Sequence, residues 1–248
     1  MIRLTIFLTA ASLLAQTPAI SDGTAHVASV SPNVRALAAE KAVSKSETLR
    51  YSINWPSSLS LGEAELVSST DGTGLSFGFT LNASLPGFPI EERAKSSASP
   101  GFCSFRLDKA FTHGPKNAKE ETEFQSSALT ATRTTANGGG KTELTTSQCP
   151  KDALTFLFFL RNELAHGRIP QMEKVFYGSP YDTRVEFKGT QTIRVSEAPV
   201  VVDRVVATIK GPNSQNTVEM FFAHDATRTP VMVRVPFAMG SFSMELVR

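Results

Sequence analysis

The chain has 248 residues, and its 41% hydrophobic residues and 17 phenylalanines are enough to bury a sizeable core. Its 25 basic and 23 acidic side chains leave a formal charge of +2, so composition indicates no electrostatic partner. The arginines are dispersed among acids and apolar residues, whereas a nucleic-acid binder gathers its basic residues on one face. We therefore expect no nucleic-acid partner.

The N-terminus has the pattern of a cleavable secretory signal peptide, predicted over residues 1–15. Arg3 supplies the positive start, and Leu4 to Leu14 form an apolar run that ends among small residues. Cleavage is expected after Ala15, with Ala19 as the alternative. A membrane anchor is the competing interpretation, but the run is well short of the roughly 20 residues that span a bilayer. We expect an exported chain, in the periplasm first of all, with no transmembrane span after cleavage.

Residues 16–46 are rich in Ala and Ser and are interpreted as a tether. Residues 33–45 contain good helix formers, but their apolar stripe is narrow, so a short helix and disorder both fit. A single barrel-like domain is predicted from residue 47 to residue 248.

From Thr48 the hydrophobic pattern changes to a period of two, which is typical of a half-buried strand. A break at 56–58 separates this strand from a second one at 61–67, and the Asp71-Gly72 turn leads into a third at 75–85. These three segments predict an antiparallel meander.

Further strands are predicted along the rest of the chain. They cover residues 90–95, 102–107, 120–125, 129–135, 141–146, 174–177, 181–189, 192–196, 200–210, 217–223, 231–235 and 241–247. The run Asn137-Gly138-Gly139-Gly140 is interpreted as a hairpin turn rather than a phosphate loop, because no strand-loop-helix context surrounds it. The predicted fold class is all-β, or β-dominated α+β: an antiparallel barrel-like or strongly curved sheet with one central helix, because curling removes free edges.

The one helix is predicted between Pro150 and Gly167, where Asp152 complements the N-terminal dipole. Arg161 falls on the apolar stripe of this helix, so its guanidinium is expected to be buried and to need a partner. We interpret Arg161 as a candidate ligand-binding residue for an anionic head group or carboxylate. The alternatives are an ion pair with an acid such as Asp225 or Glu186, or an extended side chain that reaches the rim.

Cys103 and Cys149 are the two cysteines of the chain. An even number of cysteines in an exported protein predicts one structural disulfide, with two buried thiols as the alternative. A metal site is not expected, because no histidine lies near either cysteine with ligand spacing.

Several segments together resemble a bacterial family of exported proteins known as domain of unknown function 3108, over roughly residues 47–248. The matching residues are Glu47, Leu49, Tyr51, Ile53 and Trp55 with Leu61-Gly62-Glu63-Ala64; Asp152-Ala153-Leu154, Phe159-Leu160-Arg161 and Gly167; and Phe222-Ala223-His224-Asp225, Arg228-Thr229-Pro230-Val231, Gly240-Ser241 and Glu245-Leu246. The chain departs from the pattern at residues 56–60, where a shorter glycine-containing turn is common. The resemblance implies an antiparallel β-barrel-like fold in the cell envelope and carries no established activity, cofactor or catalytic residue.

The sequence contains no nucleophile elbow, no His-Glu-x-x-His and no phosphate loop, and its four histidines lack ligand-like spacing. We therefore predict no catalytic residue, metal or cofactor; Asp225 is interpreted as a turn residue. Export, strand alternation and abundant Phe favour a non-catalytic binding protein for a lipid-like or other apolar molecule. The alternatives are a hydrolase acting on envelope polymers, which needs acids or a nucleophile and base in a polar cleft, and an envelope assembly factor with an exposed apolar patch.

Overall fold

The computed structural model describes residues 46–55, 59–85, 87–136, 139–212, 214–237 and 240–247. The predicted signal peptide and the tether up to residue 45 lie outside the described residues. The strands are β1 (Ser46–Asn54), β2 (Ser60–Thr70), β3 (Leu75–Leu85), β4 (Phe88–Ala98), β5 (Ser104–His113), β6 (Lys116–Gln125), β7 (Thr130–Thr135), β8 (Gly140–Thr145), β9 (Lys151–Asp152), β10 (Met172–Phe176), β11 (Pro180–Val195), β12 (Ala198–Lys210), β13 (Gln215–Ala223), β14 (Pro230–Phe237) and β15 (Gly240–Leu246). The helix of the described part is α1 (Ala153–Ala165).

All described strands belong to one 15-stranded sheet in which consecutive strands pair antiparallel, except that β8 and β9 do not pair and that β9 runs parallel to β10. The first and last strands are also neighbours, since β1 pairs with β15 as well as with β2. The one parallel pair of the described sheet joins β9 to β10. The sheet edges are therefore β8 and β9, which follow each other directly along the chain.

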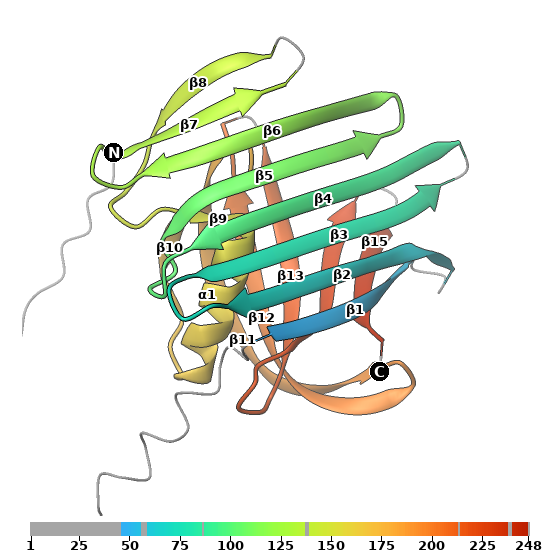
Figure 1. The fold of residues 1–248 in the computed structure, drawn as a ribbon. Helices are drawn as coiled ribbons and strands as arrows, with labels where there is room; N and C mark the ends of the chain where they lie inside the picture. Colours follow the sequence, from blue (N-terminus) through green and yellow to red (C-terminus); the bar gives the residue numbers. More distant parts are fainter. Residues whose placement is uncertain are drawn as a thin grey trace, which may run out of the picture.

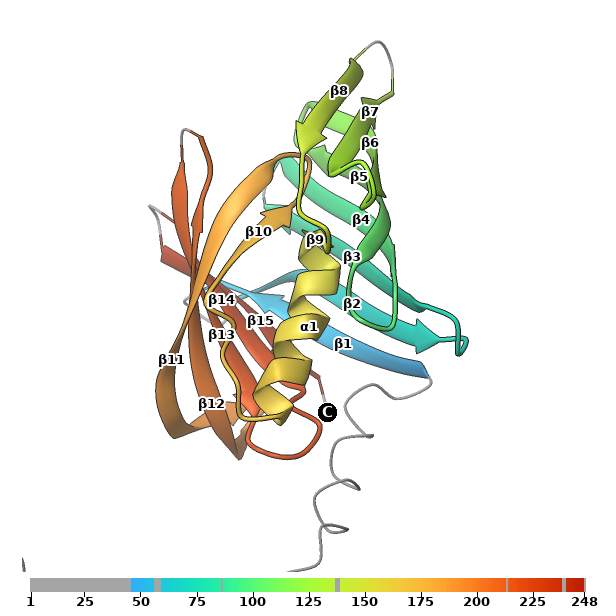
Figure 2. The ribbon, with the colours of Figure 1, turned by 90° about the vertical axis from the view of Figure 1, so that its left-hand side faces the viewer.

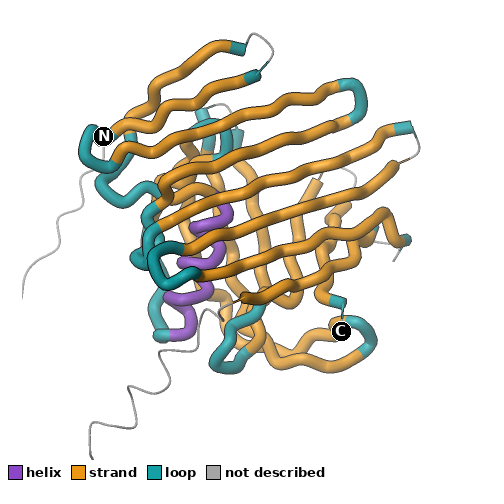
Figure 3. Tube along the Cα trace, viewed as in Figure 1, coloured by secondary structure: helices purple, strands orange, loops and turns teal. Residues whose placement is uncertain are grey.

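The sheet curls around α1 without closing into a complete barrel (Figure 1). In the view of Figure 2, the helix lies between two halves of the sheet, β2 to β8 on one side and β10 to β14 on the other. Figure 3 shows how little of the described chain lies outside strands and this helix. The predicted fold class, a barrel-like or strongly curved antiparallel sheet with one central helix, is confirmed.

The helix α1 begins because Asp152 caps it. One carboxylate oxygen of Asp152 accepts hydrogen bonds from the backbone amides of Leu154 and Thr155, at 2.9 and 3.1 Å. The hydroxyls of Ser96 and Ser104 donate to the other oxygen, at 2.5 and 2.6 Å. Asp152 is completely buried, and these bonds offset the cost of burying its charge while anchoring the helix to β4 and β5.

The predicted helix start at Pro150 was three residues too early. Lys151 and Asp152 instead form β9, a short strand that the sequence pattern did not predict. The end was predicted correctly: His166 caps the last turn, and Gly167 follows in the left-handed region at φ +69°.

The helix packs into the curl with two of its faces. Phe158 stacks on Phe77 of β3, with ring centroids 4.3 Å apart. On the opposite side Leu160 lies in a cluster with Val205 and Phe222 of β12 and β13. Each half of the sheet thus buries part of its inner apolar face against the same helix.

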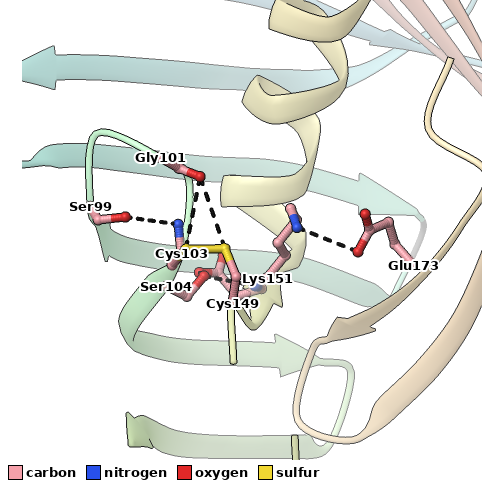
Figure 4. Close-up of a disulfide and its surroundings, with 8 residues drawn as sticks. Ser99, Gly101, Cys103, Ser104, Cys149, Lys151 and Glu173 are labelled. Atoms are coloured by element: carbon pink, nitrogen blue, oxygen red, sulfur yellow. Dashed lines mark hydrogen bonds and ion pairs between the residues drawn. A yellow bond between two sulfur atoms is a disulfide. The ribbon is translucent and has the colours of Figure 1, made fainter. Parts of the chain in front are cut away.

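The predicted disulfide between Cys103 and Cys149 is present (Figure 4). Cys103 lies just before β5, and Cys149 lies just before β9. Next to the disulfide, the amide of Ser104 donates to the carbonyl of Pro150 at 2.8 Å. The bridge therefore attaches the strand that leads into α1 to the middle of the opposite half of the sheet.

Candidate functional site

A cavity of about 520 Å³ lies on the concave side of the sheet. Its lining comes from strands β1 to β5, β14 and β15: Ile53, Leu61, Phe79, Leu81, Ala83, Ser84, Phe88, Ile90, Glu92, His113, Val233, Val235, Phe242, Ser243 and Met244. The volume falls within the roughly 300–1,000 Å³ that is typical of small-molecule sites, and the lining is mostly apolar, as in such sites.

The alternation of β3 builds one wall of this cavity. Phe79, Leu81 and Ala83 face the concave side, whereas Thr80 and Asn82 between them face outwards. The helix packs on the other end of the same strand, at Phe77. Figure 1 shows α1 at one end of β2 to β5 only. The cavity is therefore the part of the curl that α1 does not fill.

Glu92 of β4 is the acid of the described cavity lining. The hydroxyl of Tyr177, from the turn after β10, donates a hydrogen bond to Oε1 of Glu92. Burial, and secondarily the nearby carboxylate of Glu92, raises the pKa of Tyr177 far above its usual value, so the hydroxyl keeps its proton. The pair places a carboxylate and a phenol at the edge of a mostly apolar space.

Lys109 lies next to Tyr177 and is paired with an acidic side chain. Its ammonium is 3.1 Å from Oε2 of Glu120, and it lies over the rings of Tyr177 and Phe111, 4.4 and 5.2 Å from their centroids. The Lys109 side chain is only 10% exposed. Its charge is thus balanced within the protein.

The turn between β10 and β11 is held against the opposite half of the sheet. Arg133 of β7 donates to the carbonyl of Gly178, and Phe124 of β6 makes an edge contact with Phe176 at 5.4 Å. The sheet edges β8 and β9 do not pair through backbone hydrogen bonds. These contacts and the Tyr177–Glu92 bond instead link the two halves of the sheet through side chains.

Arg161, the candidate ligand contact predicted from the sequence, is buried outside the lining of the cavity. Its guanidinium forms an ion pair with Glu47 of β1, with 3.0 Å between Nη2 and Oε1. It also donates to the carbonyl of Thr227 at 2.6 Å and to the hydroxyl of Thr229 at 3.3 Å. Arg161 does not line the cavity, and its acidic partner is neither Asp225 nor Glu186. A ligand contact for Arg161 stays a prediction.

A second polar cluster lies around Asp203 of β12, whose side chain is 6% exposed. Asp203 accepts hydrogen bonds from Thr190 at 2.7 Å and from Arg228, and its Oδ1 is 2.8 Å from Nδ1 of His224. The Asp–His pair looks like part of a hydrolase triad. Within the described residues, however, His224 bonds to Asp203 and Arg228 and to no hydroxyl or thiol, so the cluster lacks a nucleophile.

The described residues contain no group of three or more His, Cys, Asp or Glu side chains arranged to hold a metal ion. In the same part of the chain, no helix has the length and apolar character needed to cross a membrane.

Sequence reasoning missed the cavity, Glu92 and Tyr177. One signal was available: in β4 the period of two places Glu92 on the same face as Ile90 and Ala94, which are inward-facing. Tyr177 gave no such signal, because it lies in a turn and reaches Glu92 across a sequence separation of 85 residues.

The fold defines a class of barrel-like β proteins. It is similar to the crystal structure of a beta-barrel-like protein of domain of unknown function DUF1849 from Brucella abortus, with 9% sequence identity and a TM-score of 0.60 over 81% of this chain and 95% of that one. At this identity the likeness concerns the fold alone. The model of the family described as Protein of unknown function (DUF3108) matches residues 50–247, so the chain belongs to that family, which confirms the resemblance found in the sequence. No curated protein matches the chain.

Proposed function

We propose that the protein is an exported, non-catalytic binding protein whose cavity holds a lipid-like or other apolar molecule. The observation that carries the proposal is the cavity of about 520 Å³ inside a curl that already contains a helix. An apolar space left open to solvent is costly unless something occupies it. Burial of an apolar ligand against this lining contributes about 25 cal/mol for each Å² removed from water.

Export is supported by two independent features of the chain. The N-terminal residues have the pattern of a signal peptide. The Cys103–Cys149 disulfide fits an oxidising compartment such as the periplasm, because cytosolic thiols are kept reduced. A hydrolase receives less support, since within the described residues the Asp203–His224 pair bonds to no nucleophile, and Asp203 already accepts hydrogen bonds from Thr190 and Arg228.

The experiment is native mass spectrometry of the protein purified from its own cell envelope, followed by the same measurement on two variants. Ala83→Phe places a ring into the cavity, whereas Asn82→Phe adds the same ring on the exposed outer face of the same strand. We expect the wild-type protein and Asn82→Phe to carry an apolar ligand and Ala83→Phe to lose it.

The proposal fails in either of two cases. In the first, the wild-type protein carries no ligand and, after delipidation, takes up no alkyl-chain probe. In the second, folded Ala83→Phe keeps the same ligand occupancy as Asn82→Phe. Circular dichroism of both variants establishes that each is folded.

A further inference from the structure

We infer that the ligand places a hydrogen-bond donor, an amine or a hydroxyl, against Glu92 and carries no anionic group inside the cavity. This inference rests on the proposed function and adds a chemical class to it. The carboxylate of Glu92 is the feature that sets the class, because it lines the cavity in the midst of apolar side chains.

The carboxylate of Glu92 has acceptor capacity left over. Tyr177 donates to Oε1, and an ionised carboxylate offers about four acceptor sites on its two oxygens. Glu92 is partly buried. A ligand that excludes water from the cavity lowers the local dielectric constant, and this strengthens a hydrogen bond from the ligand's donor to Glu92. The phenol of Tyr177 fixes the rotamer of Glu92 and thereby preorganises it.

The charges around Glu92 disfavour an anion at the same place. The described lining of the cavity contains neither Lys nor Arg, and His113, on β5, is the one side chain in it that can become cationic. The ammonium of Lys109, which lies over the ring of Tyr177, is paired with Glu120. A fatty-acid carboxylate or a phosphate next to Glu92 would therefore be a like charge without compensation, which costs free energy in a site of low polarity.

The chemistry of the site accordingly fits an amphiphile with an apolar chain and a donor-bearing, neutral or cationic polar group. The apolar chain lies against the side chains of Phe79, Leu81 and Ala83 on β3 and of Val233 and Val235 on β14. A cationic amine forms a charge-assisted hydrogen bond with Glu92 and is favoured over an alcohol.

The test compares three probes with the same alkyl chain, dodecylamine, dodecanol and laurate, by calorimetry at neutral pH below their micellar concentrations. The delipidated wild-type protein is expected to bind dodecylamine most tightly and laurate least tightly. Glu92→Gln keeps an acceptor for Tyr177 but removes the charge, and is expected to weaken dodecylamine binding about tenfold while improving laurate binding. Glu91→Gln removes the same charge from the exposed neighbouring position and is expected to change neither.

The outcomes separate the two proposals. Binding of laurate by the wild-type protein as tightly as dodecylamine overturns the inference about the polar group and leaves the apolar binding function standing. An equal loss of dodecylamine affinity in Glu91→Gln and Glu92→Gln also overturns it, because the effect would then be one of net charge. Failure of all three probes to bind overturns the inference about the polar group, and it removes the proposed function as well when the protein purified from its envelope carries no ligand.

Discussion

Glu47 and Arg161, 114 residues apart in sequence, form a buried ion pair that joins the first described strand to the last turns of the helix. The Arg161 side chain is 4% exposed and that of Glu47 is 21% exposed. Arg161 also holds the loop between β13 and β14 through the carbonyl of Thr227. One guanidinium thus connects three parts of the chain, and Tyr51 of β1 lies beside it, donating to the carbonyl of Pro230 at 2.8 Å.

Substitution of either partner is expected to destabilise the protein. Arg161→Met leaves the Glu47 carboxylate without its partner, and loss of one member of a buried pair costs about 3–5 kcal/mol. We expect a decrease in the free energy of unfolding toward the lower end of that range, because Glu47 is partly exposed. Urea denaturation measures it, and the double variant Glu47→Leu with Arg161→Met is expected to recover part of the loss.

The same variant tests the role of Arg161 as a ligand contact. If Arg161 acts only in structure, folded Arg161→Met keeps the ligand occupancy of the wild-type protein in native mass spectrometry. A variant that is folded yet has lost its ligand would show instead that Arg161 contributes to binding despite its distance from the cavity lining.

The Cys103–Cys149 disulfide is expected to stabilise the protein by about 4 kcal/mol. It closes a loop with a sequence separation of 46, and the chain-entropy model gives that value for the restriction of the unfolded chain. Replacement of both cysteines by serine, compared with the wild-type protein in chemical denaturation, measures the effect. A loss below about 1 kcal/mol would mean that the hydrogen bond of Ser104 to Pro150 and the cap at Asp152 hold this region without the bridge.

The sequence predicted most of the elements but not which of them meet. The period of two in β1 and β3 and the helical stripe around Arg161 are local signals, and the structure contains those elements. Two predicted strands, 181–189 and 192–196, are one strand, β11, because the irregularity between Phe187 and Thr190 bends the strand without ending it.

Contacts between distant segments could not be predicted in the same way. The burial of Arg161 follows from its place on the helical stripe, but the choice of Glu47 over Asp225 or Glu186 depends on how the first strand lies beside the helix. The cavity is likewise a property of the curl: its walls come from strands at both ends of the chain, and the space is what remains after α1 has packed.

Gly62 in β2 is expected to tolerate no side chain. A Cβ atom at this position would lie 2.0 Å from the carbonyl oxygen of Asn82 on β3, which is backbone and has little freedom to shift. We expect Gly62→Ala to lower the free energy of unfolding by about 2 kcal/mol or more. Gly78→Ala is the matched control, because its Cβ would be in ordinary contact with Val67 at 3.7 Å. Equal thermal stability of the two variants would contradict the close approach of β2 and β3.

Asp225 is expected to make the free energy of unfolding depend on pH in the acidic range. Burial raises the pKa of its carboxyl, but hydrogen bonds from the hydroxyl and amide of Thr227 and from the amide of Arg228 outweigh this, so the pKa in the folded protein lies below its usual value. A carboxyl with a depressed folded-state pKa stabilises the protein above its unfolded-state pKa of about 3.9, and this contribution disappears as pH falls through the folded-state pKa.

Low pH is therefore expected to destabilise the loop between β13 and β14, which contains Asp225 and Arg228 and contacts Arg161. The free energy of unfolding, measured in urea at a series of pH values, should decrease below about pH 4 in the wild-type protein. Asp225→Asn keeps an acceptor oxygen for Thr227 but does not titrate, so its stability should decrease less steeply over the same interval. Asp225→Ala also loses the acceptor and should be less stable than Asp225→Asn at neutral pH. Parallel curves for the wild-type protein and Asp225→Asn would show that other carboxyls, such as that of Glu163 bonded to Arg168, account for the acid sensitivity.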